Sequence, residues 1–154
     1  MSPYISRVVR GECIWEYAPK AQEGLNELLR SDSFAHGELV GLIEDSEQRG
    51  GLGKAYGRKE ELDYRAPLPF APDKAHAPPW LGELKVVGKR GVEHRLYFSE
   101  PDGTDENIVV AVGYGYKERG SDLFGIKQRD HITKVMGYTK YVFRTLGYTC
   151  RPFE

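Results

Sequence analysis

The chain has 154 residues, of which 40% are hydrophobic and 29% are charged, and its formal net charge is −1. This length and composition are typical of one globular domain with a sizeable core. The near-zero charge gives no general attraction to nucleic acid, and no run approaches the roughly 18 apolar residues that a membrane span needs. Residues 1–11 lack the apolar centre of a signal peptide, so we expect a loose arm and a cytoplasmic protein.

The segment that follows is expected to hold a strand and two helices. Residues 13–17 read CIWEY, a run of aromatic and β-branched side chains typical of a short strand. Pro19 suits the first turn of a helix, and apolar residues recur at helical spacing as far as Leu29. Ser33 is predicted to cap a second helix, which should end before Gly50.

Residues 50–80 differ in composition and pattern from the rest of the chain. They contain four glycines and five prolines, and their apolar residues show neither a helical nor a strand period. A loop of about thirty residues inside a compact domain is uncommon and is usually functional. Apolar residues recur from Leu52 to Trp80, so we expect a loop strapped across the body of the domain. Two roles stay open: the loop covers an edge of the sheet, or it lines a site for a substrate or partner.

The chain is expected to be organised around residues 81–117. Three runs rich in β-branched and aromatic residues, at 83–87, 94–99 and 107–116, are separated by turn signals. Connections of hairpin length make consecutive strands antiparallel neighbours, so we predict an antiparallel sheet of three to four strands. Strict alternation in the last run predicts that one face is shared by Ile108, Val110, Val112, Tyr114 and Tyr116.

A C-terminal helix is predicted from Lys127 to Gly147, where apolar residues recur at helical spacing and the glycine provides a C-cap. We expect this helix and the two N-terminal helices to pack on one face of the sheet and to leave the other face for function. Cys13 and Cys150 have no metal-ligand spacing and are expected to be reduced thiols. The chain 1–154 is therefore predicted to be a single α+β domain.

Cationic and phenolic side chains are concentrated on and beside the predicted sheet. Arginine and lysine can hold a phosphate and stabilise the charge that develops on it, and aromatic rings can stack on bases. Such a set suits RNA cleavage without a metal, with a lysine, histidine or tyrosine as general base and acid. The sequence has no Gly-Lys-Ser phosphate loop and no His-Glu-Xaa-Xaa-His zinc pattern. The alternative is that these charges merely solvate the exposed face of a half-buried sheet.

Three segments resemble the RelE/ParE toxin superfamily, nearest to its HigB-like and phage-derived members. They are EYAPKAQEGLNELL at 16–29, LGELKVVGKRGVEHRLYF at 81–98 and IVVAVGYGYKERG at 108–120. The order of a strand, a helical hairpin and a three-strand meander is also similar. The resemblance implies a RelE-like fold and the toxin of a toxin–antitoxin system. Such a toxin cuts mRNA on the ribosome without metal or cofactor, which inhibits translation, and is held in check by a cognate antitoxin protein.

The resemblance also implies site residues. The catalytic set is Lys85, Arg95, Tyr97 and Lys117, in which Arg95 and Lys117 stabilise the phosphate and Lys85 assists proton transfer. The RNA-binding set adds Lys89, Arg90 and Arg119 by proximity to these residues, and Tyr114 and Tyr116 as aromatic rings that could stack on bases. His94 is expected to face away from Tyr97 and to serve the core or an edge. Because relatives on this scaffold act on gyrase, the alternative is a non-catalytic protein-binding module, including a gyrase inhibitor.

Overall fold

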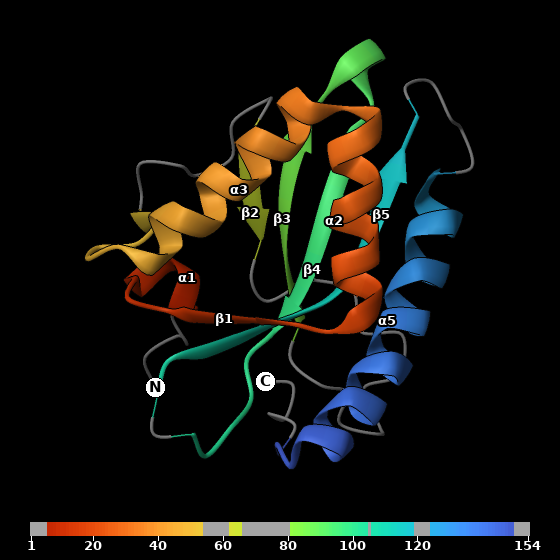
Figure 1. Cartoon of the computed structure of the whole chain (residues 1–154). Coiled ribbons are helices and arrows are strands. Elements are labelled where there is room, and N and C mark those ends of the chain that lie inside the picture. Colours follow the sequence, from red (N-terminus) through yellow and green to blue (C-terminus); the bar gives the residue numbers. More distant parts are fainter. Residues whose placement is uncertain (1–5, 54–61, 66–80, 105, 119–123, 150–154) are drawn as a thin grey trace.

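The structure, a computed structural model, describes residues 6–53, 62–65, 81–104, 106–118 and 124–149, with the side chains of 62–65 and 124–132 excepted. Five strands form one sheet in the order β1-β5-β4-β3-β2 (Figure 1). The strands are β1 (Ile14–Tyr17), β2 (Leu62–Arg65), β3 (Leu81–Val87), β4 (Glu93–Ser99) and β5 (Ile108–Lys117). The helices are α1 (Arg7–Arg10), α2 (Pro19–Ser31), α3 (Ser33–Glu47) and α5 (Phe124–Leu146). The predicted α+β class is confirmed.

The predicted meander is present, since β3, β4 and β5 are antiparallel neighbours. The sheet differs from the prediction in being mixed, because β1 runs parallel to β5, and in having five strands where three to four were expected, because β2 pairs with β3. The strand β2 lies inside the segment 50–80, where only a loop was expected. The rest of the proposed strap, at 54–61 and 66–80, lies outside the described residues.

Helices cover both faces of the sheet, which corrects the expectation of three helices on one face. The core between the sheet and the α2–α3 hairpin includes Leu84, Leu96, Phe98, Val109 and Ala111, and the core under α5 includes Leu81, Tyr97, Val110 and Val112. The reason lies in β5, whose neighbouring positions are apolar on both faces. A strand of this kind needs cover on both sides.

A β-bulge in β5 changes which side chains share a face. Tyr97 pairs with Gly113 while Phe98 pairs with Ala111, so Val112 is the extra residue. Beyond the bulge the alternation is inverted, and Tyr114 packs on the hairpin side of the sheet, not with Val112 as predicted. The bulge therefore places the two tyrosines of β5 on the hairpin side and its terminal lysine on the α5 side, the reverse of what unbroken alternation would give.

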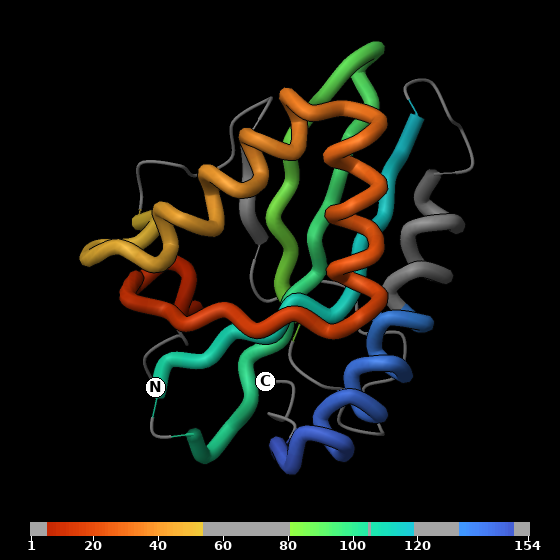
Figure 2. Tube along the Cα trace, viewed as in Figure 1, coloured from red at the N-terminus to blue at the C-terminus, as the bar shows by residue number. Residues whose placement is uncertain are grey.

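The corner between α2 and α3 is fastened to the β3–β4 turn (Figure 2). Asp32, rather than the predicted Ser33, is the N-cap of α3, and its Oδ1 accepts the Ala35 N–H at 3.1 Å. The other carboxylate oxygen accepts the Lys89 N–H at 2.7 Å. Gly88 is required beside this contact, because a Cβ there would lie 2.3 Å from Asp32 Oδ2.

Residues 6–11 are more ordered than the loose arm that was expected at 1–11, whereas residues 1–5 lie outside the described part of the chain. Residues Arg7–Arg10 form the short helix α1. The buried carboxylate of Glu100 accepts the Ser6 hydroxyl at 2.8 Å and the Arg7 N–H at 2.9 Å. A polar contact of high sequence separation thus holds α1 against the end of β4.

Candidate functional sites on the two faces of the sheet

The first candidate site is a cluster of charged side chains on the α5 side of the sheet, which we call the Glu93 cluster. It consists of Glu83, Lys85, Glu93, Arg95 and Lys117. The register creates it, because Lys85 lies opposite Arg95 and Glu93 lies opposite Lys117 across neighbouring strand pairs. Three of the four predicted catalytic residues are therefore brought together.

Three cations of the Glu93 cluster converge on one carboxylate. The Lys85 ammonium lies 3.6 Å from Glu93 Oε1, and the Arg95 guanidinium lies 3.8 Å from the same oxygen. The Lys117 ammonium lies 3.8 Å from Oε2. Arg95 also lies 3.4 Å from Glu83, which is only 5% exposed. The sequence reading missed both acids, although the period-two spacing of Glu93 and Arg95 places them on one face.

Tyr97, the fourth predicted catalytic residue, is 1% exposed and packs with Val110, Met136 and Phe143 under α5. Its phenol is thus part of the core in this structure and does not reach solvent beside the cations. The geometry supports a role in fixing the sheet, and it does not support direct contact between Tyr97 and a substrate.

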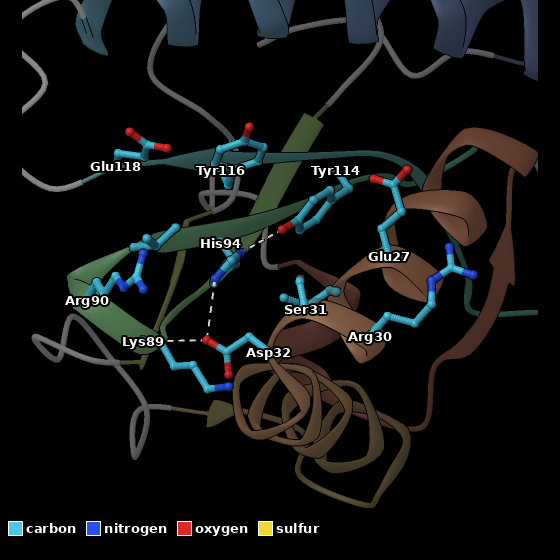
Figure 3. A pocket seen from close by; sticks show the side chains of 12 residues that line it. Glu27, Arg30, Ser31, Asp32, Lys89, Arg90, His94, Tyr114, Tyr116 and Glu118 are labelled. Atoms are coloured by element: carbon cyan, nitrogen blue, oxygen red, sulfur yellow. Dashed lines mark hydrogen bonds and ion pairs between the residues drawn. The ribbon is translucent and has the colours of Figure 1, made fainter.

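The second candidate site is a pocket of about 700 Å³ on the opposite face, between the α2–α3 corner and the ends of β4 and β5 (Figure 3). Four of the predicted RNA-binding residues line it, namely Lys89, Arg90, Tyr114 and Tyr116. Tyr116 is 60% exposed and is the more accessible of the two tyrosines that line this pocket. The fifth, Arg119, lies outside the described residues.

A chain of polar groups crosses the wall of this pocket. His94 Nδ1 and the Tyr114 hydroxyl are 2.6 Å apart and share a hydrogen bond, while His94 Nε2 lies 4.0 Å from Asp32 Oδ2 (Figure 3). His94 is 6% exposed and faces away from Tyr97, as predicted. Gly24 lets α2 approach, because a Cβ there would lie 2.5 Å from the Tyr114 Cβ.

Burial and hydrogen bonding set the protonation of this chain. Burial lowers the pKa of His94, partly offset by the Asp32 carboxylate, so the imidazole is neutral at pH 7. Burial by itself would raise the pKa of Asp32, but the Lys89 and Ala35 N–H groups lower it on balance. Burial and nearby negative groups raise the pKa of Tyr114. The three polar groups are therefore a neutral imidazole and a neutral phenol beside an ionised carboxylate.

The charges around the pocket are balanced. Its cationic side chains are Arg30, Lys89 and Arg90, and its acidic side chains are Glu27, Asp32 and Glu118. Such a surface has no net attraction for a polyanion. The predicted platform of cations and aromatic rings is thus split by the sheet, with Lys85, Arg95 and Lys117 on one face and Tyr114 and Tyr116 on the other.

Comparisons with known proteins do not add to this geometry. The sequence matches no family model, and neither a curated protein nor a solved structure was found to match it. No helix in the described part of the chain combines the length and apolarity that crossing a bilayer requires. Function is therefore inferred from the residues of the two sites.

Proposed function

We propose that the protein is a metal-independent endoribonuclease of the toxin type, acting on mRNA at the ribosome, with its phosphate-binding residues in the Glu93 cluster. The observation that carries the proposal is the convergence of Lys85, Arg95 and Lys117 from three adjacent strands. The order of β1, the helical hairpin and the meander also supports it, because the resemblance to RelE-like toxins rests on that order.

The proposed reaction is transfer of the phosphoryl group within RNA. The 2′-hydroxyl gives its proton to water as its oxygen attacks phosphorus, the bond to the 5′-oxygen breaks, and the products are a 2′,3′-cyclic phosphate and a 5′-hydroxyl. Negative charge grows on the phosphoryl oxygens during this step, and Arg95 and Lys117 stabilise it. Lys85 delivers a proton to the leaving 5′-oxygen.

The test uses the two cations that can be changed without uncovering buried Glu83. Lys85→Met and Lys117→Met keep the aliphatic length of each side chain and remove the charge. Each is expected to lower the rate of mRNA cleavage in a translating extract by about 100-fold, the usual effect of losing one transition-state donor. Cleavage by the unchanged protein should persist in EDTA and yield 5′-hydroxyl ends.

The matched control is Lys140→Met, which removes the same charge from an exposed position on α5. This variant should cleave like the unchanged protein. Cleavage that survives both Lys85→Met and Lys117→Met would rule out the Glu93 cluster as the catalytic site. Absence of any cleavage by the unchanged protein on ribosomes would rule out the function itself.

A second candidate function, a protein-binding module that includes a gyrase inhibitor, is favoured by the balanced charges of the pocket in Figure 3. A peptide carries both signs of charge and suits such a surface better than RNA does. In this case Arg90→Glu together with Tyr116→Ala should abolish growth arrest on expression, while Lys85→Met and Lys117→Met leave it intact. The opposite result supports the ribonuclease.

A further inference from the structure

Glu93 is held in a different way from the other acid of its cluster. Glu83 is buried and lies 3.4 Å from the Arg95 guanidinium. The Glu93 side chain is 23% exposed, and its three contacts, at 3.6, 3.8 and 3.8 Å, are all longer than a hydrogen bond. Glu93 is also the first residue of β4, beside the turn. Its carboxylate can therefore rotate toward solvent without disturbing the core.

The positive charge around Glu93 exceeds the single negative charge of its carboxylate. Lys85, Arg95 and Lys117 carry three positive charges in total. Glu83, which forms an ion pair with Arg95, carries one negative charge. Counting only the side chains that the structure describes, the cluster without Glu93 has a net charge of +2. This matches the two negative charges on a phosphate or on the phosphoryl group of RNA midway through cleavage.

We infer that the Glu93 cluster is a binding site for a phosphoryl anion, and that Glu93 fills it as an internal counter-ion which such a ligand displaces. The anion site stands on the geometry alone, whereas identifying its ligand with the RNA backbone rests on the proposed function. Tetrahedral phosphoryl oxygens can accept charge-assisted hydrogen bonds from all three cations at once. The planar carboxylate reaches the same cations only at ion-pair range.

The test measures the affinity of the full chain for inorganic phosphate by titration calorimetry. Glu93→Gln keeps the shape of the side chain and removes its charge, and we expect phosphate to bind at least about tenfold more tightly than to the unchanged protein. Glu44→Gln is the matched control, since Glu44 is exposed on α3 across the sheet and the charge change is identical. This control should leave phosphate affinity unchanged within about twofold.

A second variant keeps the test decisive if Glu93→Gln lowers stability through repulsion among the three cations. In the Glu93→Gln/Lys117→Gln protein the gain in phosphate affinity should disappear. The rise in melting temperature caused by phosphate should follow the same order, largest in Glu93→Gln and smallest in the double variant. Equal phosphate affinity in the unchanged protein and in Glu93→Gln would overturn the inference.

Two further arms separate this inference from the proposed function. A single-stranded RNA with 2′-O-methyl riboses cannot be cleaved, and it should compete with phosphate if the RNA backbone is the ligand. Tighter phosphate binding to Glu93→Gln without RNA competition or cleavage leaves the anion site standing and removes the ribonuclease. Loss of cleavage in Glu93→Gln with unchanged phosphate affinity would support the ribonuclease and overturn the anion site. In that case Glu93 would take part in proton transfer during cleavage.

Discussion

Asp32 offers the sharpest test of how the pocket is held together. Its buried carboxylate caps α3 through the Ala35 N–H and fixes the β3–β4 turn through the Lys89 N–H, at 3.1 and 2.7 Å. Replacing Asp32 with Asn leaves one acceptor oxygen for two backbone donors. The added NH₂ group then faces a backbone N–H, so one of these contacts is lost.

The magnitude follows from the contact that is lost. A hydrogen bond to an ionised group contributes about 1.5–3 kcal/mol, so Asp32→Asn should lower the free energy of unfolding by that amount. Asp32→Ala loses the cap as well and should cost about 1 kcal/mol more. For a chain of this size each kcal/mol corresponds to a fall of about 2–4 °C in melting temperature.

The measurement is urea unfolding at pH 7, with Asp102→Asn as the control because Asp102 is exposed. A loss below about 0.5 kcal/mol in Asp32→Asn, the size of an ordinary surface substitution, would refute this account of the α2–α3 corner. Hydrogen exchange at the Lys89 amide gives an independent reading, because this amide should lose protection in both Asp32 variants.

The pH dependence of stability tests the same contact. The folded protein holds the pKa of Asp32 below its ordinary value of 3.8. The stability that this shift contributes is therefore complete at neutral pH, and it is lost as the pH falls below about 4 toward the folded-state pKa. The unchanged protein should lose more stability than Asp32→Asn over this range, and parallel curves would contradict the shift.

Two further predictions concern packing and burial. Gly24→Ala should cost about 1–3 kcal/mol by forcing Tyr114 aside, since the new Cβ would lie 2.5 Å from its Cβ. Gly37→Ala, with nothing within 4 Å, should instead stabilise α3 by up to about 1 kcal/mol; equal unfolding curves for the two variants would contradict this. Burial raises the pKa of Cys13 to about 11, so iodoacetamide should label the Cys13 peptide about a hundredfold more slowly in the folded protein than in urea, as measured by mass spectrometry.

Local sequence pattern was sufficient to predict most of the helices and strands. Pro19 lies at the first position of α2 as predicted, and Gly147 follows α5 with φ +78°, the conformation of a C-cap glycine. The meander strands lie within two residues of their predicted limits. These features depend on side-chain period, turn chemistry and capping, which act over a few neighbouring residues.

The face of the sheet on which each site residue lies could not be predicted from local sequence pattern alone. Strict alternation would have kept Tyr114 with Val112, but the extra residue of the bulge is accommodated only when β5 pairs with β4. His94 was correctly predicted to oppose Tyr97, because no bulge interrupts that part of β4. The placement of Tyr114 and Tyr116 at the pocket and of Lys117 in the Glu93 cluster therefore depends on one register shift.

The sequence by itself determined the α+β class, the helical hairpin, the meander and the presence of lysines and arginines on neighbouring strands. Only the tertiary structure decided that β1 lies parallel to β5, that α5 covers the face opposite the hairpin, and that Glu93 lies among three cations. The physical reason is the sequence separation over which each kind of interaction acts. Period and capping are properties of adjacent residues, whereas strand order, bulge position and ion pairing arise only when segments far apart in the chain are brought into contact.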